Sequence, residues 1–84
     1  MKLILLALRD IKAGLWKPPM AVNNIPSALR DLADMMADQA NKEDWARHPE
    51  DFELYDIGTY DTETGRIDIK DHQSQICVMA NLKR

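Results

Sequence analysis

The chain has 84 residues, of which 45% are hydrophobic and 30% charged, and its formal net charge is -3 at pH 7. This length allows one small domain and excludes most multi-step catalysis. The ordinary hydrophobic content argues against global disorder. A single cysteine, Cys77, excludes an intramolecular disulfide framework and a cysteine-rich zinc site. Such a small domain is only marginally stable alone, which favours association with a partner or a second copy.

The charge is unevenly distributed along the chain. Residues 1–30 carry five basic side chains and one acidic side chain, which is a net charge of +4. Residues 31–84 carry six basic and thirteen acidic side chains, which is a net charge of -7. This separation makes either one basic face on an acidic protein or two complementary faces on neighbouring copies, and composition does not choose between them.

The N-terminal apolar run, Leu3–Leu8, covers six residues and stops at Arg9. A secretory signal needs about 7–15 apolar residues and a membrane span about 20, so neither is predicted and the cytoplasm is the default location. A short continuous apolar run favours a strand buried on both faces, and we predict this strand over residues 2–9. Residues 15–23 contain Pro18 and Pro19 and are predicted to be an extended crossing segment, with a short edge strand at 20–22.

A helix is predicted over residues 24–40. Asn24 can cap it through its side-chain oxygen, and Pro26 is tolerated in the first turn because the amides there lack partners. Apolar residues then follow at spacings of four, three and four, which places on one helix face Ile25, Leu29, Leu32 and Met36.

The C-terminal half reads as a polar connection over 42–49 followed by a β-hairpin over 52–70. Phe52 and Leu54 alternate with Glu53 and Tyr55, and a turn containing Gly65 precedes the return strand. Residues 71–75 form a polar break, and residues 76–80 form a last apolar piece, either strand or short helix. Cys77 in that piece is predicted to be a small core residue.

These elements predict an α+β fold for a single domain, residues 1–84. A small, mainly antiparallel sheet, made of the N-terminal strand and the C-terminal hairpin, packs against one central helix. Because one helix covers only one face of a sheet, and Leu3–Leu8 requires burial on both, we predict a homodimer or a higher homo-oligomer.

No residue pattern in the sequence predicts catalysis, a metal site or a cofactor. His48 and His72 lie in polar segments without the three or four convergent ligands that a metal needs. The carboxylates around the hairpin turn are expected to be solvated, whereas acid–base work requires a partly desolvated pocket. The glycines are isolated and form no phosphate loop, so we expect a protein that is not an enzyme.

One set of residues has the chemistry of a nucleic-acid site, since it combines four cations with an aromatic ring: Arg9, Lys12, Trp16, Lys17 and Arg30. Cations follow the phosphates of single-stranded nucleic acid, and an aromatic ring stacks on a base. The competing interpretation is that Trp16 belongs to the core and that the cations are merely solvated.

Two stretches resemble a known family. The first contains Arg9-Asp10-Ile11-Lys12-Ala13, then Val22-Asn23 and Ala28-Leu29-Arg30. The second, more distinctive stretch is His48-Pro49-Glu50-Asp51-Phe52-Glu53-Leu54-Tyr55, which continues to Asp61 and Glu63-Thr64-Gly65. Together, over residues 8–70, they resemble the small nonstructural protein of gokushoviruses and related microviruses, which are single-stranded DNA bacteriophages.

The resemblance implies a protein that is made during infection, is absent from the virion and acts in the bacterial host. It also implies DNA binding and a role in single-stranded genome synthesis and packaging. We therefore predict a nonstructural accessory protein that binds single-stranded DNA or the replication complex. The alternative is an oligomeric protein-interaction module that contacts a phage replication or procapsid protein, or a host protein, without binding DNA. Neither function involves a membrane.

Overall fold

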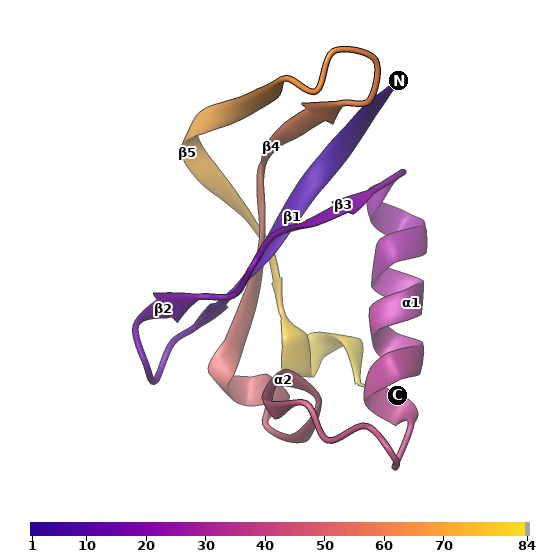
Figure 1. Cartoon of the computed structure of the whole chain (residues 1–84). Coiled ribbons are helices and arrows are strands. Elements are labelled where there is room, and N and C mark those ends of the chain that lie inside the picture. The colour runs from indigo at the N-terminus through magenta and orange to yellow at the C-terminus, as the bar shows by residue number, and fades with distance from the viewer. Residues whose placement is uncertain (84) are drawn as a thin grey trace.

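The structure, a computed structural model, describes residues 1–83 and shows a five-stranded antiparallel sheet with one main helix packed against it (Figure 1). The strands are β1 (Lys2–Asp10), β2 (Leu15–Trp16), β3 (Met20–Val22), β4 (Phe52–Asp61) and β5 (Ile67–Val78). The helices are α1 (Ile25–Ala37) and the one-turn α2 (Asp44–Arg47), with 3-10 turns η1 (Pro49–Asp51) and η2 (Met79–Leu82). The predicted α+β class is confirmed.

The central strand of the sheet is β1, which pairs with β4 on one edge and with β2 and β3 on the other. Leu6 and Leu8 point to the α1 side and join the core cluster. Leu5 and Ala7, on the other side of β1, are buried as well. Both sides of this strand are thus buried within one chain, which removes the reason for predicting a second copy. Oligomerisation stays a prediction, without that support.

Helix α1 begins as predicted, because the Asn24 side-chain oxygen accepts a hydrogen bond of 2.9 Å from the Ser27 amide. It ends at Ala37, three residues before the predicted Ala40. The Asp38 carboxylate accepts a hydrogen bond from the Ala40 amide at 2.9 Å. This local bond offers the backbone an alternative to another helical turn, which is why the helix stops here. The face toward the sheet buries Ala28, Leu32 and Ala33.

The predicted polar connection at 42–49 contains structure that the sequence did not indicate. Residues 44–47 form α2, and Trp45 on this single turn is 8% exposed. The Asp44 side chain accepts a hydrogen bond from the Trp45 amide at 2.8 Å. Trp45 belongs to the core cluster together with Phe52, Leu54 and Met79. A short polar segment can therefore supply a core residue when its largest apolar side chain is turned inward.

The hairpin is longer than predicted, since β5 runs continuously through the predicted polar break at 71–75 and through most of the last apolar piece. Its pairing with β4 is irregular at two places. Ile67–Ile69, Ser74, Gln75, Cys77 and Val78 have partners, whereas the segment 70–73 and Ile76 have none in the register. An outer strand exposes its side chains to water, so polar residues do not interrupt it. The last apolar piece, 76–80, is divided between the end of β5 and η2. Cys77 is partly buried against the core, and this burial raises the pKa of its thiol.

Gly58 lies on β4 at a point where the pairing register shifts, both against β1 and against β5. A Cβ atom at this position would overlap the backbone carbonyl oxygen of Asp68 on β5. Only glycine therefore permits this close approach of the two strands.

Candidate nucleic-acid interface

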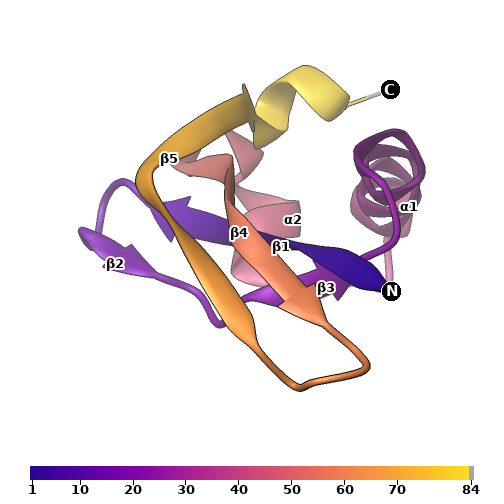
Figure 2. The same ribbon diagram turned by 90° about the horizontal axis from the view of Figure 1, so that it is seen from above.

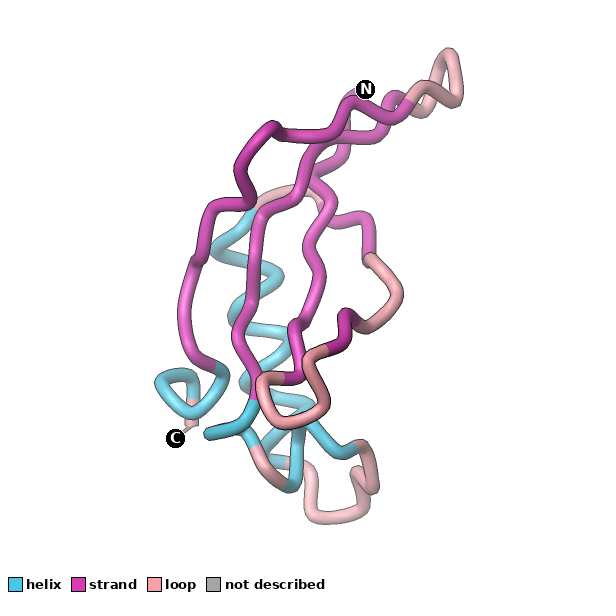
Figure 3. The backbone as a smooth tube through the Cα atoms, turned by 90° about the vertical axis from the view of Figure 1, so that its left-hand side faces the viewer, coloured by secondary structure: helices cyan, strands magenta, loops and turns pink. Residues whose placement is uncertain are grey.

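One face of the sheet, opposite α1, is not covered by a helix. Figure 3 shows the strands lying in front of α1, and no helix within residues 1–83 crosses in front of them. The pairing register assigns side chains to this face: Ala7 is opposite Tyr55, and Arg9 is opposite both Glu53 and Trp16. Directly opposed residues share a face, and Leu6 and Leu8, which alternate with Ala7 and Arg9 along β1, point toward α1. We call this surface the open face.

A cluster of two aromatic rings and a cation lies on the open face. The Trp16 and Tyr55 rings meet edge to face, with centroids 5.0 Å apart and an interplanar angle of 65°. The Arg9 guanidinium lies 5.4 Å from the centroid of the Trp16 ring, within the range of a cation–π interaction. Trp16 remains 40% exposed. It is thus neither a core residue nor a loose surface side chain, but a ring held in place with part of its surface in water.

Hydrogen bonds fix the second ring of this cluster. The Tyr55 hydroxyl donates to the Glu53 carboxylate at 2.9 Å, and the Gln75 amide donates to the other Glu53 oxygen at 3.2 Å. The bond to Glu53, followed by burial, raises the pKa of the Tyr55 hydroxyl, so the phenol stays neutral. Because both carboxylate oxygens of Glu53 accept hydrogen bonds, this acidic group serves to orient its neighbours on the open face.

Lys12 lies in the turn between β1 and β2, next to the cluster in the chain. Gly14 adopts a φ of 68°, and its amide donates to the Asp10 carbonyl at 2.9 Å, which closes the turn. The Asp10 side chain also accepts a hydrogen bond from the Ala13 amide at 3.1 Å. Lys12 at the tip is exposed and forms no ion pair within residues 1–83. Its ammonium group is therefore available to a phosphate.

Lys17 is separated from the cluster although it follows Trp16 directly. Its ammonium group lies 2.7 Å from the Asp44 carboxylate and 5.8 Å from the centroid of the Phe52 ring. The hydrogen bond between Lys17 and Asp44 raises the pKa of the lysine and lowers the pKa of the carboxyl. Lys17 thus points to the α2 side and forms an ion pair there.

Arg30 is also remote from the cluster. It lies on α1, and Figures 1 and 2 both show α1 and β2 on opposite sides of the molecule. Of the five residues that the sequence suggested, the structure brings together Arg9 and Trp16, with Lys12 in the adjoining turn, and it places Lys17 and Arg30 elsewhere.

Tyr55 is the one cluster residue that the sequence interpretation did not include. The strand alternation correctly put Glu53 and Tyr55 on one face and Phe52 and Leu54 on the other. Nothing in that pattern showed that β2 would bring Trp16 beside Tyr55, because the two residues lie far apart in the chain.

Two kinds of feature are absent from the described part of the chain. Within residues 1–83, no three His, Cys, Asp or Glu side chains gather as metal ligands. No helix in the same range has the length and apolar character that a bilayer span requires.

A comparison with protein families finds one match that spans nearly the whole chain. A family model described as Phage ORF5 protein matches residues 3–82. Neither the curated proteins nor the solved structures give a match.

Proposed function

Because the chain belongs to the Phage ORF5 protein family, we propose that it is a nonstructural accessory protein of a small single-stranded DNA bacteriophage of the microvirus type. In this proposal it binds single-stranded DNA, alone or within the replication complex, during genome synthesis and packaging in the host cytoplasm. The observation that supports DNA binding most directly is the cluster of Arg9, Trp16 and Tyr55 on the open face.

The geometry of the cluster suits an unpaired base. Stacking of a base on an aromatic ring contributes about 1–3 kcal/mol and tolerates any base, since every base has a π-face. Tyr55 and Arg9 hold the Trp16 ring in one orientation, so little side-chain freedom is lost when a base stacks on it. In a duplex the bases are already stacked on one another, and the cluster would then offer only charge.

The charges near the cluster set the strength of binding. Arg9 and Lys12 can each contact a phosphate, whereas the protein as a whole is acidic with a net charge of -3. We therefore expect binding of moderate affinity that depends on stacking as much as on charge. Two phosphate contacts predict a shallow dependence on salt, with a slope of about -1.4 in log K against log salt for single strands.

The first test is fluorescence anisotropy with a labelled oligothymidylate at low salt. Trp16→Ala should weaken binding about tenfold, because it removes one stacked base. Lys12→Gln should weaken binding, and Arg30→Gln is its control, since it removes the same charge from another exposed position, on α1. A duplex of the same length should bind more weakly than the single strand.

Three results would contradict the proposal. One is the absence of oligothymidylate binding by the wild-type chain at low salt. A second is unchanged affinity in Trp16→Ala when circular dichroism shows that the variant is folded. The third is an equal loss in Lys12→Gln and Arg30→Gln, which would indicate diffuse electrostatic attraction without a site.

A further inference from the structure

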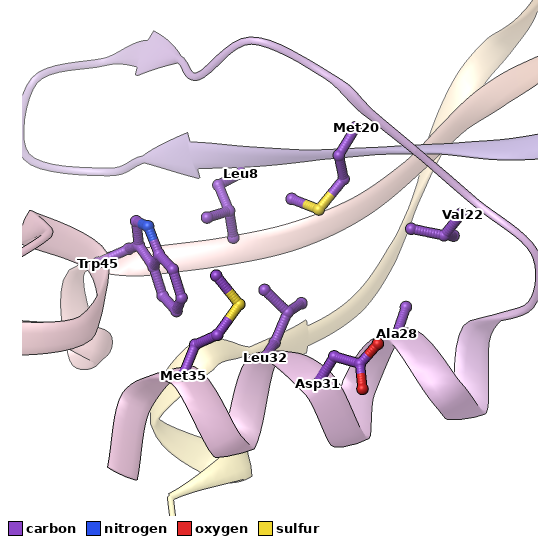
Figure 4. A pocket seen from close by; sticks show the side chains of 8 residues that line it. All are labelled: Leu8, Met20, Val22, Ala28, Asp31, Leu32, Met35 and Trp45. Atoms are coloured by element: carbon purple, nitrogen blue, oxygen red, sulfur yellow. The ribbon is translucent and has the colours of Figure 1, made fainter. Parts of the chain in front are cut away.

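An apolar groove lies between β3 and α1, on the side of the sheet away from the open face. It has a volume of about 350 Å³ and is lined by Leu8, Met20, Val22, Leu32, Met35 and Trp45. Figure 4 shows Met20 and Val22 of β3 and Leu32 and Met35 of α1 directed into the space between the two elements, with Trp45 at one end. This volume accommodates large apolar side chains but is at the lower limit of small-molecule sites.

The outer edge of β3 runs along this groove. Within residues 1–83, β3 pairs only with β1, and Ala21 in its centre is exposed. Backbone groups on the outer side of an edge strand can pair with an added strand. In this arrangement the alternate side chains of the added strand enter pockets beside the edge, which is how extended peptides bind between a strand and a helix.

The rim of the groove is mainly acidic. Asp31 lines the groove, and Glu43 lines its continuation past Met35 and Trp45. The Asp31 carboxylate lies 3.8 Å from Nε of Arg30, and 69% of the Asp31 side chain is exposed. Lys17 lines the same continuation as Glu43, and its charge is already paired with Asp44. The two carboxylates, Asp31 and Glu43, therefore favour a partner segment that carries a basic side chain near Asp31.

We propose that the groove between β3 and α1 binds an extended peptide segment of a partner protein. The segment adds a strand to the outer edge of β3 and inserts a bulky apolar side chain among Met20, Leu32 and Met35. A lysine or arginine beside that anchor pairs with Asp31. Methionine suits such a site because its flexible side chain adapts to differently shaped anchors, and Met35 is already 47% exposed. This binding is independent of DNA binding, since it uses the opposite side of the sheet.

The test begins with a display library of random decapeptides that is selected on the full-length protein. Enriched peptides should carry bulky apolar residues at alternate positions, with a lysine or arginine next to them. In nuclear magnetic resonance spectra, a synthetic selected peptide should shift the amide signals of Met20–Val22 and of α1. The same peptide with N-methyl groups on alternate amides should bind about tenfold more weakly, because it cannot pair with the strand edge.

Two variants of the protein localise the binding. Met35→Lys should reduce peptide affinity about tenfold, because a charge then occupies an apolar pocket. Ile69→Lys is the matched control, since this isoleucine is 63% exposed on the far strand β5. The Ile69→Lys variant should bind the peptide with the affinity of the wild type. Asp31→Lys should weaken the basic peptide several-fold and strengthen the same peptide with glutamate in place of its basic residue.

The proposal fails if no peptide is enriched or if the enriched peptides shift the open face around Trp16 and Tyr55. It also fails if Met35→Lys, shown to be folded by circular dichroism, binds as the wild type does. Concentration-dependent self-association that Met35→Lys abolishes would identify the occupant as a second copy and overturn the assignment to a partner peptide. None of these outcomes depends on whether the protein binds DNA.

Discussion

The Lys17 ammonium group and the Asp44 carboxylate lie 2.7 Å apart, and this ion pair connects the segment between β2 and β3 to α2. Both side chains keep partial contact with water, being 36% and 43% exposed. The two residues are 27 positions apart in the chain, so the pair helps to hold the proline-containing crossing segment against the one-turn helix that carries Trp45. It also explains why Lys17 is not available on the open face.

The Lys17–Asp44 pair predicts a defined dependence of stability on pH. The pKa of Asp44 is lowered from its ordinary value of 3.8, mainly by the hydrogen bond from Lys17. The contribution of Asp44 to the free energy of unfolding is therefore complete above pH 3.8. It is lost as the pH falls through the lower pKa of the folded state. Lys17, whose pKa is raised from 10.5, contributes below that value and loses its contribution as the pH rises through the folded-state pKa.

Asp44→Asn and Lys17→Met should each lower the urea midpoint at neutral pH. The difference between wild type and Asp44→Asn should shrink as the pH falls below 3.8, and it should decrease with added salt because both groups are partly exposed. Arg66→Met, at a more exposed ion pair with Asp68, is the control and should change the midpoint less. A constant difference across the acidic range would contradict the role assigned to the pair.

Replacing each of the two tryptophans should lower the free energy of unfolding by a different amount. Trp45 is 8% exposed in the core, and Trp45→Ala should cost about 3–5 kcal/mol in the free energy of unfolding. Trp16 is 40% exposed, and Trp16→Ala should cost about 1 kcal/mol, mainly through its contact with Tyr55. Denaturant titrations measure both values. Equal costs would show that Trp16 belongs to the core after all.

Tryptophan fluorescence gives a second comparison of the same two rings. In Trp45→Phe the remaining emission comes from Trp16, and oligothymidylate should quench it. In Trp16→Phe the emission comes from buried Trp45, and the oligonucleotide should leave it unchanged. Quenching of Trp45 with no response from Trp16 would place the nucleic acid away from the open face.

Gly58 and Gly65 should respond differently to alanine. At Gly65, with a φ of 74°, an added Cβ meets no neighbour, and only the left-handed conformation costs about 1–2 kcal/mol. At Gly58 the Cβ would overlap the Asp68 backbone, so Gly58→Ala should cost about 3 kcal/mol or more, because two paired strands must separate. Urea denaturation of both variants measures the difference. A smaller loss for Gly58→Ala would mean that the β4–β5 bulge yields easily.

The N-terminal cap of α1 can be tested with two neighbouring asparagines. Asn24 accepts the Ser27 amide hydrogen bond, and Asn24→Ala should lower the free energy of unfolding by about 1 kcal/mol. Asn23→Ala changes an adjacent exposed asparagine that does not cap the helix, and it should have little effect. Similar losses in the two variants would show that the cap does not stabilise α1.

Local patterns in the chain were sufficient for most of the elements and for the fold class. The apolar run in residues 3–8 predicted β1, Asn24 and the spaced apolar residues predicted α1, and alternation from Phe52 predicted β4. Such patterns work because side-chain periodicity and capping act between residues close in sequence. They did not identify α2, whose single turn is too short for a periodic signal, or the continuation of β5 through a polar outer edge.

The candidate site depended on contacts between distant segments. The sequence supplied a list of cations and one ring, but only the folded chain pairs Trp16 with Tyr55, places Arg9 over the indole, and directs Lys17 to Asp44. The register of β1 against β2 and β4 decides which of these residues share a face, and a shift of one residue would reverse it. The uneven charge of the chain is likewise a property of the sequence. Its distribution over the open face and the acidic rim of the groove arises from strand pairing and helix packing, which join residues that composition cannot relate.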